Sequence, residues 1–256
     1  MKIALYIKES LLDNDVDTYL IGKLTEHGFD FDQDNPDFVI VVGGDGTFLK
    51  AVHSYIDSLD EVQFVAINGG SLGFYSDYVL DEIDELLISL SRGDYNCKTA
   101  SLLEGEIGDK VIYAVNEIRV ESPLTTLLCD VEINGTHLEK FSGNGLVVSS
   151  SLGSTAYNKS LGGAVVLGDI DVMELTEIAP INNRIYHSLN SPMVLVGEDN
   201  EIVLKGDFSN CVVGYDCFSV NNGLNSLKVK ISSKKLTFIY KNERNFIDKI
   251  RDNLVE

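Results

Sequence analysis

The sequence predicts an α/β N-terminal domain with a Rossmann-like parallel sheet, followed by a β-rich C-terminal domain that forms an antiparallel β-sandwich. Over residues 1–96, apolar strand-like segments alternate with amphipathic helix-like segments, which is the pattern of βαβ units. Over residues 97–237, short alternating segments follow one another with turn residues between them. The tail, about 238–256, reads as a strand and a short helix, and is a candidate to dock back on the N-terminal domain.

The elements of the first half are read from the period of the apolar residues. Three strands are expected, and the second, FVIVV, is apolar throughout, as in a strand buried on both faces: 2–7, 38–42 and 62–68. Three helices are expected from apolar residues at helical spacing: 15–28, 47–59 and 79–93. Gly28 and Gly93 end two of these helices as natural C-caps.

The second half shows turn signals typical of hairpins. Asn134-Gly135 lies between two alternating segments and predicts a two-residue hairpin, and Gly108-Asp109 predicts another. Further strands are expected at 145–150, 192–197, 201–206 and 227–232. One stretch, DVMELTEIA at 171–179, has apolar residues at helical spacing and is expected to be a helix.

Composition excludes several classes of protein. The net charge of −20 over 256 residues argues against nucleic-acid and anionic membrane partners, which clustered Lys and Arg would hold. The longest apolar runs are far shorter than the ~20 residues that span a bilayer. The N-terminus reads as a first strand, not as a signal peptide. The four cysteines show no metal-ligand spacing, so we expect reduced thiols, no protein-held metal and a cytoplasmic location.

A glycine loop with one carboxylate, Gly43-Gly44-Asp45-Gly46-Thr47, follows the apolar strand at 38–42. Ligands of open α/β sheets bind beyond the carboxyl ends of the strands, and glycines let the backbone approach a ligand closely. A carboxylate repels phosphate. Asp45 would therefore accept a proton from an attacking hydroxyl, or hold a cation that holds the phosphates. The alternative is that Asp45 only caps the next helix.

Five stretches together resemble the NAD kinases, and more closely the short Gram-positive-type bacterial members. GGDGT alone is shared with diacylglycerol and sphingosine kinases and, in a related form, with phosphofructokinases. The remaining stretches occur in the order typical of NAD kinases: NGGSLGFYSD at 68–77, VNEIRV with Asn116-Glu117, GNGLVVSSSLGSTAYNKSLGGAV at 143–165, and INNRIYHSLNSPMVL at 181–195.

The resemblance implies an enzyme that transfers the γ-phosphoryl group of ATP to the adenosine 2′-hydroxyl of NAD and so supplies the cell's NADP. Mg²⁺ would accompany the ATP. Asp45 would be the general base or orienting group for the hydroxyl. Family members form dimers or tetramers, so the resemblance also implies a homo-oligomer.

The same resemblance implies which residues bind the nucleotides. All lie in or next to the matching stretches: Gly44, Asp45, Gly46, Thr47, Asn68, Phe74, Asn116, Glu117, Asn144, Ser154, Thr155, Ala156, Tyr157, Ala179, Ile181, Asn183 and Asp216. The Asn116 amide matches the edge of an adenine, and Glu117 can accept from a ribose hydroxyl or an amino group. The Tyr157 ring can lie against a base.

The sequence departs from the family pattern at three places, one of which is Cys217 after Asp216, where Gly or His is often found. The usual Asp-Gly is Asn144-Gly145, which keeps hydrogen bonding and loses a charge. The usual Ser-Thr-Pro-Thr-Gly is Ser149–Gly153 without the proline. These changes leave open a non-catalytic nucleotide sensor. A lipid kinase is the other alternative, and Asn116-Glu117 and the GSTAY stretch argue against it.

Overall fold

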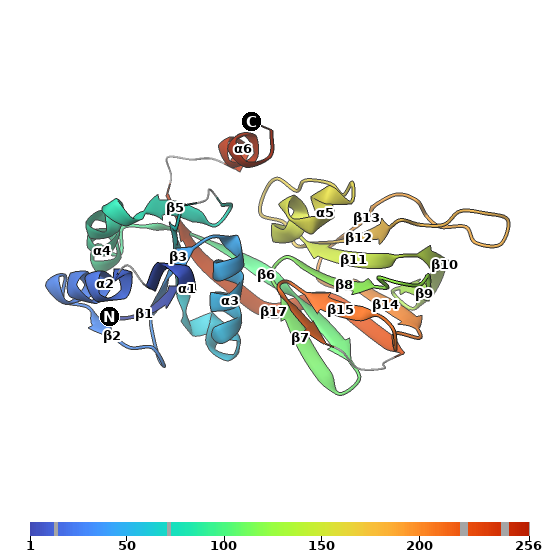
Figure 1. The fold of residues 1–256 in the computed structure, drawn as a ribbon, viewed down its shortest axis with the longest axis horizontal. Coiled ribbons are helices and arrows are strands. Elements are labelled where there is room, and N and C mark those ends of the chain that lie inside the picture. Colours follow the sequence, from blue (N-terminus) through green and yellow to red (C-terminus); the bar gives the residue numbers. More distant parts are fainter. Residues whose placement is uncertain (13–14, 71–72, 221–224, 242–245, 256) are drawn as a thin grey trace. The chain divides into compact units, whose positions relative to one another are not determined.

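The computed structural model describes residues 1–12, 15–70, 73–220, 225–241 and 246–255. The chain divides into two compact units (Figure 1). Unit 1 comprises Met1–Thr99 and Lys235–Glu256, and unit 2 comprises Ala100–Lys234. The predicted fold class is confirmed, because unit 1 is built on a parallel sheet with helices and unit 2 on antiparallel sheets.

In the sheet of unit 1, each strand named here runs parallel to the strand with which it pairs. Its strands are β1 (Lys2–Ile7), β2 (Asp30–Phe31), β3 (Phe38–Gly43), β4 (Gln63–Asn68), β5 (Ser76–Val79) and the last part of β17 (Ser226–Tyr240). β3 lies between β1 and β4, β2 pairs with β1, and β5 and β17 pair with different parts of β4. All six residues of β3 are buried, as its continuous apolar run predicts.

Helices cover both faces of this sheet (Figure 1). The helices of unit 1 are α1 (Glu9–Leu12), α2 (Val16–Glu26), α3 (Asp45–Ser54), α4 (Ile83–Arg92) and α6 (Phe246–Ile250), with 3₁₀ turns at Ile56–Glu61 and Leu80–Glu82 and a π turn at Arg251–Val255. The apolar faces of α2 and α4 pack on one side of the sheet in one core cluster. Phe48 of α3 stacks on Tyr75 at 4.4 Å between ring centroids. None of the helices in the described ranges has the length and apolar character needed to cross a bilayer.

The carboxyl ends of β1, β3 and β4 lie together at one edge of this sheet. Ile7 is in register with Val42, and Gly43 is in register with Asn68. The glycine loop therefore leaves the sheet at the edge where open α/β sheets bind ligands.

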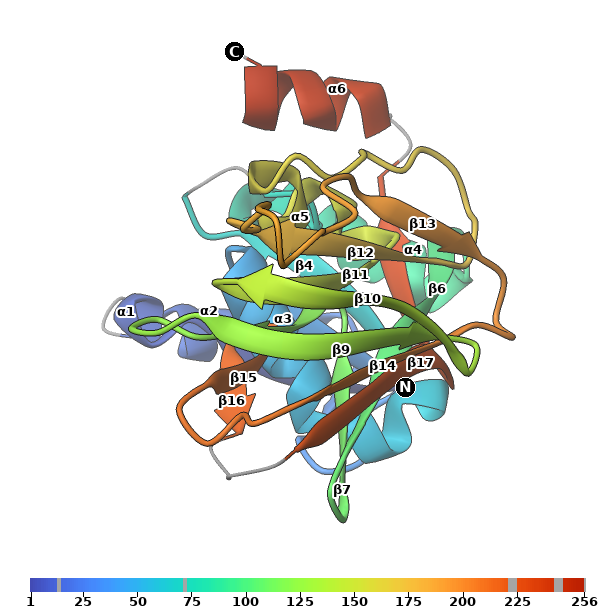
Figure 2. The same ribbon diagram turned by 90° about the vertical axis from the view of Figure 1, so that its right-hand side faces the viewer.

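Unit 2 consists of two antiparallel sheets around one core (Figure 2). The first has the order β13-β12-β11-β8-β15-β16, with bounds Met193–Val196, Val172–Ile178, Gly145–Ser150, Glu117–Glu121, Val212–Tyr215 and Phe218–Val220. The second contains β10 (Thr136–Gly143), β9 (Leu127–Ile133), β14 (Glu201–Gly206) and the first part of β17, with β6 (Asn96–Ile107) and β7 (Lys110–Ala114) at its side. A 3₁₀ turn at Leu152–Thr155 and the short helix α5 (Tyr157–Ser160) follow β11.

One sequence prediction about elements is wrong. The stretch 171–179 forms strand β12, not a helix, because its polar side chains at alternate positions find buried hydrogen-bond partners. The strand expected at 227–232 is confirmed, and it continues further as part of the 15-residue β17. Both predicted hairpins are confirmed, with positive φ at Asn134, Gly135 and Gly108.

Candidate active site

In unit 1 the glycine loop brings a carboxylate to the start of a helix. α3 begins at Asp45, and Gly44 is its N-cap without a side-chain hydrogen bond. Gly43 has φ +159° and lies so close to Thr47 that an added Cβ would come within 2.5 Å of its hydroxyl oxygen. Glycine at position 43 therefore allows the helix to begin directly at the end of β3.

The Asp45 carboxylate does not cap its own helix. It accepts hydrogen bonds from the backbone N–H groups of Phe74, at 3.1 Å, and Tyr75, at 3.2 Å, one on each oxygen. Gly73 lies against the same carboxylate, and any side chain there would collide with it. A carboxylate has about four acceptor positions, so two bonds orient it and leave each oxygen able to accept another.

The other candidates of unit 1 lie next to this carboxylate in the fold. Gly46 and Thr47 are in the first turn of α3. Asn68 ends β4 beside Gly43, and its side-chain oxygen accepts from the N–H of Gly70 at 2.7 Å. Phe74 is half-buried and contacts the ring of Phe246 in α6.

The segment after Gly73 is fixed by the helix near the C-terminus. The Lys249 ammonium group lies 2.7 Å from the Asp77 carboxylate and donates to the carbonyl of Phe74 at 3.0 Å. Both side chains are almost completely buried, at 11% and 2% exposed. The chain thus ties α6 to the segment that orients Asp45.

In unit 2, Asp216 joins the Asn116-Glu117 pair to the turn between β15 and β16. Its carboxylate accepts from the N–H groups of Val115, at 2.8 Å, and Asn116, at 2.7 Å. Asp216 has φ +47° and donates its own N–H to the carbonyl of Glu117 at 3.0 Å. Three candidates that are far apart in sequence, Asn116, Glu117 and Asp216, therefore lie together.

Glu117 is a buried carboxyl group with an unusual titration. Burial is the main cause that raises its pKa to about 7, the nearby charge of Asp216 raises it further, and Arg119 opposes both. One of its oxygens, Oε2, is buried and has no hydrogen-bond partner among the residues that the structure describes. A buried acceptor without a donor is costly, and a ligand hydroxyl or amino group would satisfy it.

Arg119 connects Glu117 to Tyr157. Its guanidinium group lies 3.3 Å from Glu117 and 2.9 Å from Glu121, and 5.9 Å from the centre of the Tyr157 ring. The Tyr157 hydroxyl donates to Glu121 at 3.0 Å. Residues 117, 119 and 121 share one face of β8. Their charged side chains and the ring of Tyr157 therefore lie together on this face.

The glycine-rich stretch packs directly on Asn116. The Asn116 carbonyl accepts from the N–H of Ser150 at 2.8 Å, and a side chain at Gly153 would collide with it. Ser154 accepts from the N–H of Val166 at 3.1 Å, and Thr155 and Ala156 connect its turn to α5.

A buried network supports the next turn of this stretch. Asn158 donates to Glu174 at 2.7 Å and accepts from Thr176 at 2.6 Å. Glu174 also accepts from the N–H of Ala164 at 2.8 Å, and Gly163 leaves room for the Asn158 amide.

The remaining candidates lie at the opposite end of the same strands. Asn144 precedes β11, and its amide donates to the carbonyl of Ser122 at 3.4 Å. Ala179 follows β12 with φ +45°, Ile181 donates its N–H to Ser142 at 2.7 Å, and Asn183 accepts from two backbone N–H groups. All five residues of β8 lie between Asn116 and this end of the strands, a separation of roughly 20 Å, so one chain does not bring the two groups together.

Two carboxyl groups hold the segment that follows Asn183. Glu139 and Glu177 accept from the N–H groups of Leu189 and Asn190, each at 2.7 Å. Burial, and then the proximity of Glu139, raises the pKa of Glu177 to about 7.

Sequence reasoning missed Gly73, Arg119 and the Asn158–Glu174–Thr176 network. The alternation Glu117, Arg119, Glu121 was a usable signal, because residues i, i+2 and i+4 of a strand share a face. Glu174 and Thr176 were missed because their strand was read as a helix. Within the described part of the chain, no three His, Cys, Asp or Glu side chains are grouped so that they could hold a metal ion.

Comparisons with known proteins agree with this arrangement. Residues 7–95 match the model of the ATP-NAD kinase N-terminal domain, and residues 115–238 match that of the ATP-NAD kinase C-terminal domain. An NAD kinase of Latilactobacillus sakei is 36% identical over 262 residues, which cover 100% of this chain and 98% of the relative. An NAD kinase of Lysinibacillus sphaericus is 32% identical over 261 residues, covering 100% and 99%.

Solved structures share the fold at lower identity. Yeast NADH kinase complexed with NADH superposes with a TM-score of 0.85 at 20% identity, covering 99% of this chain and 87% of that one. An NAD kinase from Archaeoglobus fulgidus in complex with ATP gives 0.77 at 22% identity, covering 98% and 99%.

Proposed function

The chain belongs to the ATP-NAD kinase family, and on this premise we propose that it transfers the γ-phosphoryl group of ATP to the adenosine 2′-hydroxyl of NAD, giving NADP and ADP. In this reaction the hydroxyl oxygen forms a bond to the γ-phosphorus while the bond from that phosphorus to the β–γ bridging oxygen breaks. The hydroxyl proton passes to Asp45 and then to solvent. The observation that carries this assignment is the orientation of the Asp45 carboxylate by two backbone N–H groups.

Asp45 suits the role of base because the orientation of its carboxylate is fixed and each of its oxygens can still accept another hydrogen bond. The hydrogen bonds from the N–H groups of Phe74 and Tyr75 hold the Asp45 side chain in one rotamer. Residue 73 must be glycine, because a Cβ there would collide with the carboxylate. A positioned base typically contributes a factor of about 10²–10⁴ in rate.

We also propose that unit 2 recognises NAD through Asn116, Glu117, Asp216 and Tyr157. The unpaired Oε2 of Glu117 supports this, because a ribose hydroxyl or an adenine amino group would donate to it. The backbone of Asn116 is held by Asp216 and by the turn at Gly153, so its side chain starts from a fixed position.

Mg²⁺ is proposed to enter with ATP. Magnesium is commonly held by one or two carboxylates together with substrate phosphates and water, and a single carboxylate in the glycine loop fits that mode. When bound, the ion would neutralise charge on the transferring phosphoryl group. We also propose that the chain forms a homo-oligomer and acts in the cytoplasm; light scattering after gel filtration tests the first point.

The decisive experiment is NADP⁺ formation from NAD⁺ and Mg-ATP, followed with an NADP-specific dehydrogenase, for wild type and Asp45→Asn. We expect the substitution to lower kcat about 10²–10⁴-fold with the thermal unfolding curve retained. Unchanged kcat in Asp45→Asn would show that another group takes the proton. A wild-type chain that binds NAD⁺ and gives no product even in a single turnover would instead be a nucleotide sensor.

A further inference from the structure

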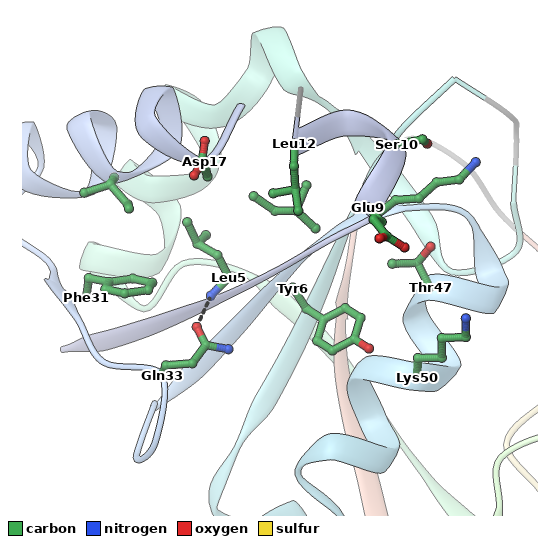
Figure 3. A pocket seen from close by; sticks show the side chains of 13 residues that line it. Leu5, Tyr6, Glu9, Ser10, Leu12, Asp17, Phe31, Gln33, Thr47 and Lys50 are labelled. Carbon is green, nitrogen blue, oxygen red and sulfur yellow. Dashed lines mark hydrogen bonds between the residues drawn. The ribbon is translucent and has the colours of Figure 1, made fainter. Parts of the chain in front are cut away.

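Arg119 in β8 is a partly buried cation of unit 2 to which the proposed reaction gives no role. Its side chain is 21% exposed, and arginine is rarely buried unless its donors are paired. It is not among the residues that line the cavity of unit 1, which has a volume of about 750 Å³ and extends beside the glycine loop to Thr47 and Lys50 (Figure 3). Its role therefore has to come from its contacts within unit 2.

The guanidinium group of Arg119 bonds to three acceptors around the residues proposed to recognise NAD. Its Nε donates to Glu121 at 2.9 Å, and its Nη1 donates to Glu117 at 3.3 Å and to the carbonyl of Asp216 at 3.0 Å. The bond to Glu117 engages Oε1, whereas the buried Oε2 has no partner among the described residues. Arg119 therefore determines which oxygen of Glu117 is available to a ligand.

The same guanidinium group holds Tyr157 in two ways. It lies over the ring, at 5.9 Å from the ring centroid, which is within the range of a cation–π contact. Glu121 bonds to Arg119 through Oε2 and accepts from the Tyr157 hydroxyl at 3.0 Å through Oε1. The ring is thus tied to Arg119 directly, and its hydroxyl is tied to Arg119 through Glu121.

Strand β15 leaves space for this arginine. Gly214 of β15 is the register partner of Arg119 in β8. A Cβ at position 214 would come within 2.7 Å of the guanidinium carbon and 2.9 Å of Nε, and its three nearest atoms all belong to Arg119. Glycine weakens the interior of a strand and often marks the close approach of another group. The guanidinium group thus occupies the place of the side chain that β15 lacks.

Arg119 is also the counter-charge within a crowded acidic group. Burial, Asp216 and Glu121 raise the pKa of Glu117, Arg119 lowers it, and the result is about 7. An ionised carboxylate accepts hydrogen bonds on both oxygens, whereas a protonated one has lost part of that capacity. Arg119 therefore favours the form of Glu117 that can accept from a ligand at Oε2.

We infer that Arg119 is a positioning residue for NAD, which presents Oε2 of Glu117 to a ligand hydroxyl or amino group and holds the Tyr157 ring for a base. This inference rests on the proposed function and adds a residue that it does not use. Arg119 acts through its neighbours, because the hydrogen bonds described above go to protein acceptors. A lysine could not replace it, since the fork of the guanidinium group serves three acceptors at once.

The test measures KM for both substrates, and kcat/KM for NAD⁺ from about pH 5.5 to 8.5, in wild type and Arg119→Gln. In wild type, kcat/KM for NAD⁺ should rise with a midpoint near the pKa of Glu117, about 7. Arg119→Gln should raise KM for NAD⁺ about tenfold at pH 7 and move the midpoint up by about one pH unit or more, because an opposite charge is lost. KM for ATP should not change.

Two further variants separate charge from geometry. Arg119→Lys keeps the charge and loses the fork, so it should raise KM for NAD⁺ while the midpoint stays near 7. Gly214→Ala keeps every charge and displaces the guanidinium group, so it should also weaken NAD⁺ and leave ATP unaffected. Lys110→Gln is the matched control, because it removes an exposed cation of β7, and it should change neither KM nor the midpoint.

A merely structural role for Arg119 predicts a different result. Arg119→Gln would then weaken NAD⁺ without moving the midpoint, and by the same factor when Glu117 is already glutamine; this outcome would overturn the inference. Unchanged KM for NAD⁺ in both Arg119→Gln and Gly214→Ala would overturn it outright.

Binding of NAD⁺, measured by calorimetry on the full chain, separates this inference from the proposed function. If wild type makes no NADP⁺ but binds NAD⁺, and Arg119→Gln and Gly214→Ala bind it about tenfold more weakly, the role of Arg119 holds and the reaction assignment fails. If NADP⁺ forms and both variants bind NAD⁺ as wild type does, the role of Arg119 fails alone.

Discussion

Replacing Glu117 with glutamine removes a buried carboxyl group of unit 2 whose hydrogen bonds and ion pair only partly offset the cost of its burial. Its residue is 5% exposed, and its Oε2 atom has no partner among the described residues. Burial and the charge of Asp216 raise its pKa from 4.5 to about 7 in the folded chain. Glutamine has the same shape and no charge at any pH, so Glu117→Gln isolates the cost of ionising this group.

The size and sign of the effect follow from proton linkage. Below about pH 4.5 the carboxyl is protonated in both states. Between about pH 4.5 and 7 the folded chain holds a proton that the unfolded chain has released, so the free energy of unfolding falls as the pH rises. The difference between 4.5 and about 7 corresponds to about 3 kcal/mol of stability lost by pH 8. The glutamine variant is spared this loss.

The assay is urea unfolding of wild type and Glu117→Gln at several pH values from 4.5 to 8. We expect the difference in free energy of unfolding to move by about 3 kcal/mol in favour of the variant over this range. The titration of Glu177 occurs in both proteins and cancels in the difference. The variant should also phosphorylate NAD⁺ more poorly, because it has lost one acceptor oxygen.

A direct readout is the ¹³Cδ chemical shift of Glu117, assigned by the signal that disappears in Glu117→Gln. Asp109→Asn, an exposed change in the β6–β7 turn, is the control and should leave the pH dependence of unfolding unchanged. Parallel pH profiles for wild type and Glu117→Gln, together with a Glu117 midpoint near 4.5, would refute the reasoning.

Two further predictions concern the segment that orients Asp45. Gly73→Ala should lower kcat at least tenfold, because the new Cβ collides with the Asp45 carboxylate and displaces it; steady-state kinetics measure this. Lys249→Met should cost about 3–5 kcal/mol in urea unfolding, because it leaves the buried Asp77 carboxylate unpaired, and adding Asp77→Asn should recover most of that loss.

Each of these predictions has a control and a contradicting outcome. Gly22→Ala changes a glycine of α2 with open space around its Cα and should leave kcat unchanged. Normal kcat in Gly73→Ala would mean that the Asp45 carboxylate tolerates displacement. If Lys249→Met and the double variant lose the same stability, the loss comes from packing of α6 and not from the unpaired charge.

The sequence predicts helices and strands well where the apolar residues follow one clear pattern, either that of a strand or that of a helix. The five apolar residues at 38–42 of β3 and the apolar face of α4, which ends at Gly93, follow directly from local patterns. The stretch 171–179 fails because its apolar residues at 172, 175 and 178 imitate helical spacing. Its polar Glu174 and Thr176 become buried on one face of β12 only because Asn158 is there to bond them.

Local patterns also predict only part of the candidate site, because the hydrogen-bond partners of its residues are distant in sequence. The glycine loop marks Asp45, but the N–H groups that orient its carboxylate come from Phe74 and Tyr75, about thirty residues further along. Asp216 meets the backbone of Asn116 across 100 residues of sequence. Local patterns identify residue types that can do chemistry, whereas their partners depend on strand pairing that no local period encodes.

The late position of β17 in the chain bears on how the protein is synthesised. Residues Thr237–Ile239 pair with Gln63–Val65 of β4, so unit 1 uses segments that lie on both sides of unit 2 in the sequence. At a synthesis rate of about 5–20 residues per second, this part of β4 waits roughly 9–35 s for its partner. An unpaired strand edge is a template for pairing with other chains. The nascent chain therefore carries its greatest aggregation risk before unit 1 closes, in the unit that holds Asp45.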